Sequence, residues 1–197
     1  MATPISSAAR KPLPARTVVF SPDLKIRANV SGDGLIKNGL GEVSLAGTNN
    51  TFIGAITVNA GSLWAENSKS FGNTNTVATV NSGGSVILFG SVAIGAKPLV
   101  LNGTGVYGLG ALAAGFGTNS WAGDITLAST ATVSTYSSSD VLTLGGGIIG
   151  TSGLTKVGPG SLRYSGATTS ESFCPHMVLQ AVQGGRRPQN KCSSSGQ

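Results

Sequence analysis

Acidic side chains are the residues from which this sequence could build a catalytic site. Sugar-cleaving enzymes use paired carboxylates, or carboxylates that hold a metal beside a basic residue. Residues 31 to 170 contain no histidine and five acids, none within four residues of another: Asp33, Glu42, Glu66, Asp124 and Asp140. Asp124 and Asp140 stay open as a pair, because successive turns of the chain could bring them together.

Glycine spacing offers a second kind of chemistry. Residues Gly103 to Gly108 read GTGVYG, which fits the G-x-G-x-x-G fingerprint of dinucleotide-binding proteins, and Asp124 follows at about the distance of a ribose-binding acid. That fingerprint requires a long helix after it, but no helical periodicity follows here, and Asp124 falls inside a strand-like run. In a chain with 30 glycines such a match arises by chance. We predict that these glycines form corners between strands and that the chain binds no cofactor.

The C-terminal segment holds the histidine and both cysteines of the chain, His176, Cys174 and Cys192. They are three possible zinc ligands, but structural zinc sites need four and usually pair them at short spacing. A disulfide between the two cysteines is open in an oxidising compartment. We favour unpaired thiols and predict no metal site. Calcium is not expected either, because the nonapeptide of calcium-binding β-rolls is missing.

Four aromatic side chains could stack on sugar rings: Phe52, Trp64, Tyr107 and Trp121. They are distributed singly along the chain. An isolated aromatic residue more often fills a core or caps one end of it. We therefore predict structural roles for these four and name no catalytic or binding residue.

Short strands are the elements that must position all of these residues. Ile56 and Val58 share one parity while Thr57 takes the other, so one side of this strand is apolar and the other polar. In the later run DVLTL, either Val141 or Leu142 can begin the apolar side. Apolar residues nowhere recur at helical spacing over a sufficient length. Together with the abundance of Gly, Thr, Ser, Asn and Val, this pattern predicts an all-β protein.

The chain divides into three parts by composition. Residues 1–23 hold four of the eight prolines and are predicted to be a flexible basic leader, residues 24–170 form the patterned body, and residues 171–197 share nothing with it and are predicted to be a disordered tail. The net charge is +6, but the basic and acidic residues from 31 to 170 balance, so the surplus lies in the ends. A neutral body without interleaved aromatic residues predicts no nucleic-acid partner.

One uncharged stretch, Pro98 to Gly123, is long enough to cross a membrane as a helix. It is rich in glycine and interrupted by asparagine and threonine, which bilayer helices disfavour. We predict a buried or self-stacked β segment and no membrane span.

An internal repeat indicates how the strands are arranged. Residues 34–47 read GLIKNGLGEVSLAG and residues 153–166 read GLTKVGPGSLRYSG, so the second copy is displaced by 153 − 34 = 119 positions. A repeat with irregular connections is typical of a solenoid, here with about six coils of roughly 20 to 25 residues. Asn38-Gly39 and Asn102-Gly103 are expected at corners with positive φ. Lys37 and Lys156 are expected at a solvent-facing corner, as one unit at two heights of a rod.

Two substitutions follow from this arrangement. Replacing Val58 with aspartate should unfold neighbouring coils, because its parity places it inside. Replacing Asp124 with asparagine should change little, because no catalytic role is assigned to it.

Residues 31 to 63 resemble the autotransporter-associated β-strand repeat, which is found in passenger domains of bacterial secreted surface proteins. The positions that fit the family pattern are Gly34, Leu35, Lys37, Gly39, Gly41, Val43, Leu45, Gly47, Asn49, Phe52, Gly54, Thr57, Val58, Gly61 and Leu63. The segments LNGTG, NSWAGDITLAS and VLTLGGGIIGTSGLTKVG follow in the usual order, so the resemblance extends from about Leu24 to Ser170. It implies a right-handed parallel β-helix (solenoid) with irregular tails, exported as a stalk or adhesive shaft and not an enzyme.

Three functions stay open. We favour a non-enzymatic passenger or stalk segment that lies outside the cell or at the outer-membrane surface in its parent protein and contacts host or matrix glycans or proteins weakly. The second is a carbohydrate-active β-helix enzyme, a polysaccharide lyase or hydrolase. The third is a truncated or frame-shifted fragment without independent function. It is suggested by the absence of a signal-peptide pattern and of a barrel sequence, and by the departure of the second repeat copy from the family near Ser170.

Overall fold

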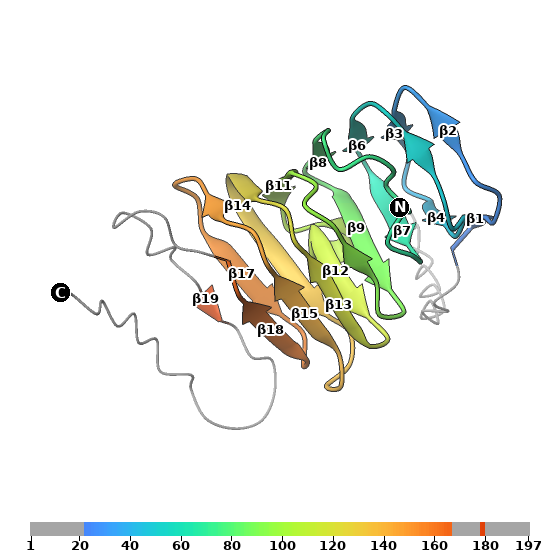
Figure 1. Cartoon of the computed structure of the whole chain (residues 1–197). Helices are drawn as coiled ribbons and strands as arrows, with labels where there is room; N and C mark the ends of the chain where they lie inside the picture. The colour runs from blue at the N-terminus through green and yellow to red at the C-terminus, as the bar shows by residue number, and fades with distance from the viewer. Residues whose placement is uncertain (1–21, 167–177, 180–197) are drawn as a thin grey trace, which may run out of the picture.

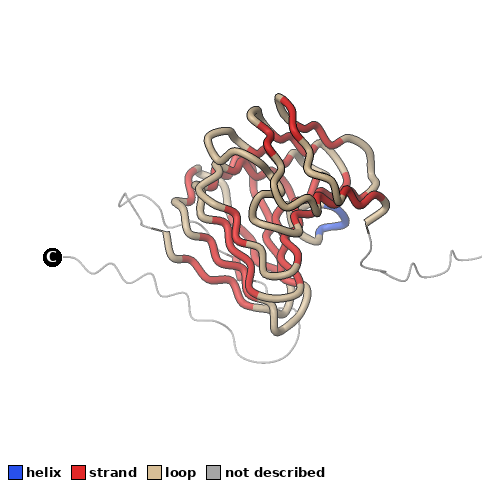
Figure 2. Tube along the Cα trace, turned by 45° about the vertical axis from the view of Figure 1, so that its right-hand side comes forward, coloured by secondary structure: helices blue, strands red, loops and turns tan. Residues whose placement is uncertain are grey.

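The computed structural model describes residues 22–166 and the backbone of residues 178 and 179. Its strands lie one above another along the molecule, in chain order from blue to orange (Figure 1). The strands pair with strands of the preceding or the following turn of the chain, most of them with both, and all of these pairings are parallel. The molecule is therefore a parallel β-solenoid, and Figure 2 shows its coils as successive loops of the tube.

The strands lie on three faces, which we number in chain order; the coil that contains β6 and β7 has no strand on the third face, whose strands therefore form two separate sheets. The first face contains β3 (Leu35–Lys37), β6 (Ile56–Val58), β8 (Ala78–Val80), β11 (Leu99–Gly103), the start of β14 (Ile125–Thr135) and β16 (Ile148–Ile149). The second contains β1 (Leu24–Ile26), β4 (Glu42–Leu45), β7 (Gly61–Ala65), β9 (Gly84–Phe89), β12 (Leu112–Gly115), the end of β14, β17 (Leu154–Val157) and β19 (Val178–Leu179). The third contains β2 (Ser31–Gly32), β5 (Thr51–Phe52), β10 (Ala93–Ile94), β13 (Thr118–Trp121), β15 (Val141–Leu144) and β18 (Ser161–Tyr164).

The length of a coil follows from the strand register and varies along the stack. The step from Leu24 to its partner Val43 is a short one (43 − 24 = 19), and the step from Ala93 to its partner Ser120 is a long one (120 − 93 = 27). These steps agree with the predicted number of about six coils, and their spread is slightly wider than the predicted one. The predicted all-β parallel β-helix is confirmed.

Alternation along each strand places apolar side chains inside the solenoid. Ile56 and Val58 are buried while Thr57 between them is partly exposed. In β15 the structure selects Leu142, which is fully buried with Leu144, whereas Val141 points the other way and is partly exposed. The apolar side chains of successive coils form one continuous core. This burial, at about 25 cal/mol per Å² of apolar area, is the main stabilising term of the stack.

The uncharged stretch Pro98 to Gly123 is β structure, as predicted. It forms β11, the short 3₁₀ helix η1 (Val106–Gly108), β12 and β13. Within residues 22–166, no helix has the length and apolar character needed to cross a membrane.

Some of the sequence predictions concern residues outside the described part of the chain. These are the leader up to residue 21, the departure from the repeat near Ser170, and Cys174, His176 and Cys192. Within the segment expected to be an unrelated tail, Val178 and Leu179 form β19, which pairs in parallel with β17.

Candidate functional site

Lys37 ends β3 and turns into the first corner, which joins the first face to the second. Its ammonium donates hydrogen bonds to the carbonyl oxygens of Asn38 at 3.0 Å, Gly39 at 2.7 Å and, in the next coil, Ala60 at 3.0 Å. Gly39 has φ 75°, the left-handed conformation predicted for this corner, which turns its carbonyl toward the ammonium. The side chain is only 7% exposed. The predicted solvent-facing position of Lys37 is therefore wrong, because carbonyl oxygens replace water around its charge.

Lys156 repeats this arrangement in the second copy of the repeat. Its ammonium donates to the carbonyl oxygens of Val157 at 3.3 Å and Gly158 at 2.5 Å, and to the hydroxyl of Thr135 in the preceding coil at 3.3 Å. Gly158 has φ 82°. Both lysines thus bind the carbonyls one and two residues ahead and one oxygen of a neighbouring coil. We call this arrangement the lysine clamp; it fastens two coils together at a corner.

The two copies nevertheless occupy different corners. Lys37 lies between the first and second faces, whereas Lys156 lies near the end of β17 of the second face, at the corner that leads to β18 of the third. The register joins Leu35 to Ile148 in five steps along one file of the first face, a displacement of 148 − 35 = 113. The two repeat copies are displaced by 119 positions, which is more than this 113. The second copy therefore lies on the next face along the chain. The prediction of one unit at two heights of the same corner is wrong in this respect.

Lys97 lies at the third corner, between β10 and β11, and is the most deeply buried of the three lysines, with 1% exposure. Its ammonium donates to the carbonyl oxygen of Asn73 at 2.5 Å and to the Thr76 hydroxyl at 3.1 Å. Its own carbonyl accepts a 2.7 Å hydrogen bond from the Trp121 indole. Each kind of corner therefore contains a lysine that is held by oxygens of the chain itself.

Burial lowers the pKa of Lys97 below its ordinary value of 10.5. Between the lowered pKa and 10.5, the unfolded chain binds more protons at Lys97 than the folded chain does. The free energy of unfolding therefore rises with pH across this interval, and it is lowest below the folded pKa. We expect the urea midpoint of unfolding to increase from neutral pH to about pH 10. Lys97→Met should flatten this increase, and an unchanged slope in that variant would contradict the role of Lys97.

Three further groups, two lysines and a tyrosine, also affect the pH dependence of stability. Burial lowers the pKa of Lys37, an effect partly opposed by Asp23, and burial also lowers the pKa of Lys156, so both should leave a residual slope in the Lys97 variant. Burial raises the pKa of Tyr136 far above its ordinary value of 10.0. Its contribution to stability is complete below pH 10.0 and is lost as pH rises toward the folded pKa. The scan should therefore end near pH 10.0.

A ladder of asparagines lines the outside of the first corner. The amide of Asn59 donates to the side-chain oxygen of Asn38 at 2.7 Å, and the amide of Asn81 donates to that of Asn59 at 2.7 Å. In the next coil the Asn102 amide donates to the carbonyl oxygen of Val80 at 3.1 Å. The sequence analysis did not identify this ladder, although the segments IKN, TVN, TVN and VLN mark it at intervals of one coil.

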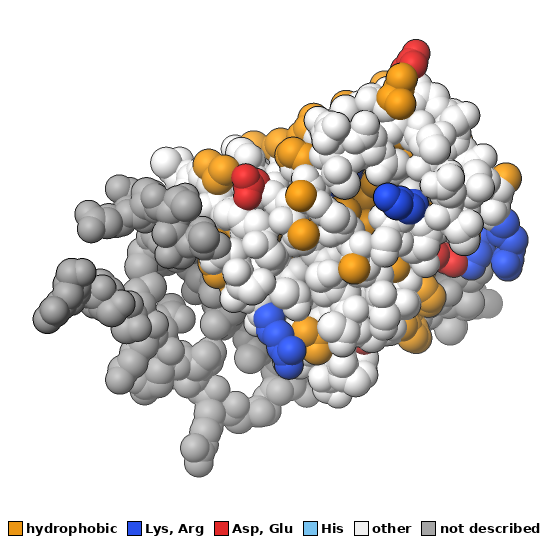
Figure 3. Space-filling view, in the orientation of Figure 1, with side chains coloured by type: hydrophobic (Ala, Val, Ile, Leu, Met, Phe, Trp, Pro, Cys, Tyr) orange, Lys and Arg blue, Asp and Glu red, His pale blue; other side chains and the backbone are white. Residues whose placement is uncertain are grey.

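A file of uncharged side chains runs beside the ladder on the outside of the first face. We call it the outer row; its members pair directly from coil to coil and are Ile36, Thr57, Thr79, Val100, Thr126 and Ile149. Ile36 and Ile149 at its ends are exposed, and the four between them are partly exposed. Figure 3 shows a face of the molecule on which charged side chains are few and scattered.

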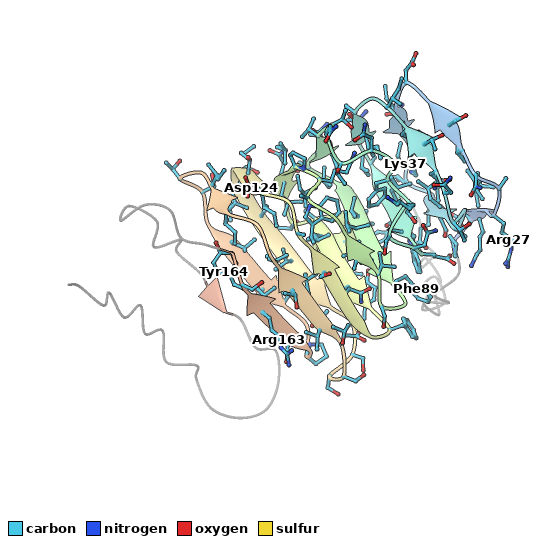
Figure 4. The ribbon with its side chains drawn as sticks, in the orientation of Figure 1. Arg27, Lys37, Phe89, Asp124, Arg163 and Tyr164 are labelled. Carbon is cyan, nitrogen blue, oxygen red and sulfur yellow. The ribbon has the colours of Figure 1, made fainter. Side chains whose placement is uncertain are left out.

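The two candidate catalytic acids lie at different corners. Asp124 precedes β14 at the third corner, not inside the strand as expected, and its carboxylate accepts a 2.7 Å hydrogen bond from the Gly147 N–H in the next coil. Asp140 precedes β15 at the second corner, where its two oxygens accept from the N–H groups of Gly117 at 3.0 Å and Ser137 at 2.7 Å. Figure 4 labels Asp124 at the start of its strand, among the C-terminal coils. The structure does not bring the two carboxylates together as a pair.

Two other acids also bind their own chain. Glu66 accepts from the Ser44 hydroxyl and forms an ion pair with Lys25, with 2.5 Å from Nζ to Oε2. Asp23 accepts a 2.8 Å hydrogen bond from the N–H of Glu42. Within residues 22–166, no three side chains of histidine, cysteine, aspartate or glutamate gather closely enough to hold a metal ion.

The G-x-G-x-x-G segment forms a loop that folds onto the outside of the second face. The Ser85 hydroxyl donates to the Gly110 carbonyl and accepts from the Val106 N–H, both at 2.8 Å. The short element η1 is followed by β12, so this loop does not lead into the long helix that a dinucleotide site requires. Gly103, which has φ 72°, ends β11 at a corner, as predicted.

Three of the four candidate aromatic residues are structural. Phe52 and Trp121 fill the core, and Trp64 forms a second buried cluster with Ile87 on the outside of the second face. Tyr107 differs: it is 76% exposed and lies in η1. Of the four, it alone presents an aromatic ring to solvent.

No family model matches this chain, and no curated protein or solved structure matches it either. Its own geometry defines it as a three-faced parallel β-solenoid, in which buried lysines, asparagines and carboxylates hold the corners of successive coils.

Proposed function

We propose that this chain is a non-enzymatic segment of a β-helical shaft, of the kind found in passenger domains of bacterial secreted surface proteins. In its parent protein it would lie outside the cell or at the outer-membrane surface. Support comes from the resemblance of residues 31 to 63 to the passenger-domain repeat and from the solenoid itself, whose coil-to-coil hydrogen bonds suit an element that extends and presents surface.

The outer row is the observation that carries this proposal. It offers six uncharged side chains in one line, three of them threonines whose hydroxyls can bond to a partner, beside the asparagine ladder. Such a surface can make many weak contacts that do not depend on the charge of the partner. Glycans and proteins of a host or matrix are partners with this chemistry.

Adhesion should depend on the outer row. Beads coated with the chain and placed on surfaces bearing matrix glycans or proteins should be retained, and the double variant Thr57→Lys/Thr79→Lys should reduce retention by roughly tenfold, since it inserts charge into the row. The matched control is Ser161→Lys, at an exposed position of β18 on the third face. Equal retention of both variants would overturn the assignment of adhesion to this row.

Substitutions of the carboxylates distinguish the proposal of a non-enzymatic shaft from the alternative of a sugar-cleaving enzyme. Asn can still accept the Gly147 N–H, so Asp124→Asn should change the free energy of unfolding by no more than about 0.5 kcal/mol. Asp140 is 1% exposed and both its oxygens accept, so Asp140→Asn should cost about 1 to 3 kcal/mol. We expect no release of reducing ends from polysaccharides by the unmodified chain. A release that either variant abolishes while still folded would favour the enzyme.

A further inference from the structure

Two members of the asparagine ladder are followed by glycine, Asn38 and Asn102. An Asn-Gly bond can deamidate without an enzyme: the glycine nitrogen attacks Cγ of the asparagine, a new N–Cγ bond forms, the Cγ–Nδ2 bond breaks, and ammonia leaves with the proton of the glycine N–H. Water then opens the resulting succinimide ring to aspartate or isoaspartate. Nothing is oxidised or reduced. The structure treats the two sites differently.

The Asn38-Gly39 bond is open to this attack. Both residues are exposed, and a Cβ placed on Gly39 would meet no atom within 4 Å. Among the described residues nothing accepts a hydrogen bond from the Gly39 N–H, so the attacking nitrogen is not held away. The Asn38 amide nitrogen, which must leave, also has no acceptor there.

Asn59 promotes the same step. Its amide donates to the Asn38 side-chain oxygen at 2.7 Å. Attack on Cγ drives negative charge onto that oxygen, and a donor already pointing at it stabilises the charge as it develops. Asn59 thus acts on Asn38 in the way that an oxyanion-binding donor acts on a carbonyl.

The Asn102-Gly103 bond is restrained at both reacting groups. The Gly103 N–H donates to the Ser129 hydroxyl at 3.0 Å, which directs the nitrogen away from Asn102. The Asn102 amide nitrogen donates to the Val80 carbonyl at 3.1 Å, which holds the leaving group. Both residues are also only partly exposed.

We propose that Asn38 is a site of spontaneous deamidation in the folded protein and that Asn102 is protected from it. The modification places a carboxylate beside the lysine clamp, where Lys37 donates to the Asn38 carbonyl oxygen at 3.0 Å. The aspartate product keeps an oxygen for the Asn59 amide. The isoaspartate product lengthens the backbone between residues 38 and 39 and displaces the Gly39 carbonyl that the clamp uses.

Ageing of the full chain tests this proposal. The protein is incubated at mildly alkaline pH and physiological temperature, digested with pepsin in acid to prevent further conversion, and mapped by mass spectrometry that resolves aspartate from isoaspartate. In the folded protein, conversion at Asn38 should exceed that at Asn102 by about tenfold or more. In urea the two deamidation rates should become similar, because both bonds are Asn-Gly and the folded contacts that distinguish them are lost. Similar rates in the folded protein, or faster conversion at Asn102, would overturn the proposal.

Two variants separate the contributions. Asn59→Ala removes the donor at an exposed position and should slow conversion of Asn38 severalfold without affecting Asn102. Ser129→Ala frees the Gly103 N–H and should accelerate Asn102 without affecting Asn38. If Asn59→Ala leaves the Asn38 rate unchanged, the promoting role of Asn59 is wrong. If a variant fails to fold, the rates at Asn38 and Asn102 in the unsubstituted chain still show whether Asn38 is the site of deamidation.

Discussion

Val58→Asp should abolish cooperative folding of the coils around β6. The Val58 side chain is fully buried and lies in one file of the core between Lys37 and Val80 of the adjacent coils. A carboxylate at this position is removed from water, at a cost of several kcal/mol. This cost is comparable to the whole stability of an ordinary domain, about 5 to 15 kcal/mol. Far-UV circular dichroism during thermal unfolding should show loss of β structure at ordinary temperature.

Lys37, the register partner of Val58 in the preceding coil, is a cation that could lessen this effect. Its ammonium is already bound by three carbonyl oxygens at the corner, so we expect little relief. Val80→Asp, one coil further from Lys37, removes the ambiguity and should be at least as destructive. Thr57→Asp is the matched control, because its side chain points outward from the same strand. A folded Val80→Asp variant with a normal unfolding transition would refute the assignment of this file to the interior.

Gly54→Ala should have the second largest effect. A Cβ on Gly54 would lie 1.3 Å from the carbonyl oxygen of Asp33 in the preceding coil, and backbone cannot move aside as a flexible side chain can. The coils here are joined by the hydrogen bonds from Ile53 N to Gly32 O and from Leu35 N to Ala55 O, both 3.0 Å. Separating the coils to admit a methyl group strains both bonds. We expect a loss of about 3 kcal/mol or more in the free energy of unfolding.

Gly147→Ala provides the control for this substitution. The nearest atom to its Cβ would be the Asp124 carboxylate at 3.4 Å, an ordinary contact, and its φ is not positive. Alanine there should be neutral or should stabilise by about 0.4 to 1 kcal/mol, because it restricts the unfolded chain. Equal urea midpoints for the two variants would show that the solenoid tolerates a Cβ at the close approach of coils at Gly54.

Local pattern was sufficient to predict the class of fold. The alternation at Ile56, Thr57 and Val58 depends only on the geometry of a strand, in which neighbouring side chains point to opposite sides. The turns at Gly39 and Gly103 depend only on which residues tolerate positive φ. Both properties belong to a few consecutive residues, so they can be recognised without knowing what lies above or below them.

The position of the buried lysines could not be recognised in this way. A lysine in a polar sequence is expected to face water, since its charge is costly to bury. Lys37 and Lys97 can be buried because carbonyl or hydroxyl oxygens of the chain surround each ammonium, and the carbonyl oxygens of Ala60 and Asn73 reach them from neighbouring coils. These acceptors come together only when the coils stack.

The sequence alone therefore predicts an all-β solenoid of about six coils, because strand alternation and glycine corners are local and the internal repeat is visible in the residues themselves. The tertiary structure decided which corner each repeat copy occupies, because coil length is not constant: the step from Leu24 to Val43 is shorter than the step from Val86 to Leu112. It also decided that Asp124 and Asp140 lie at different corners and that Lys37 and Lys97 are buried. Each of these depends on contacts between coils, and the register that creates those contacts is fixed only when the whole stack has formed.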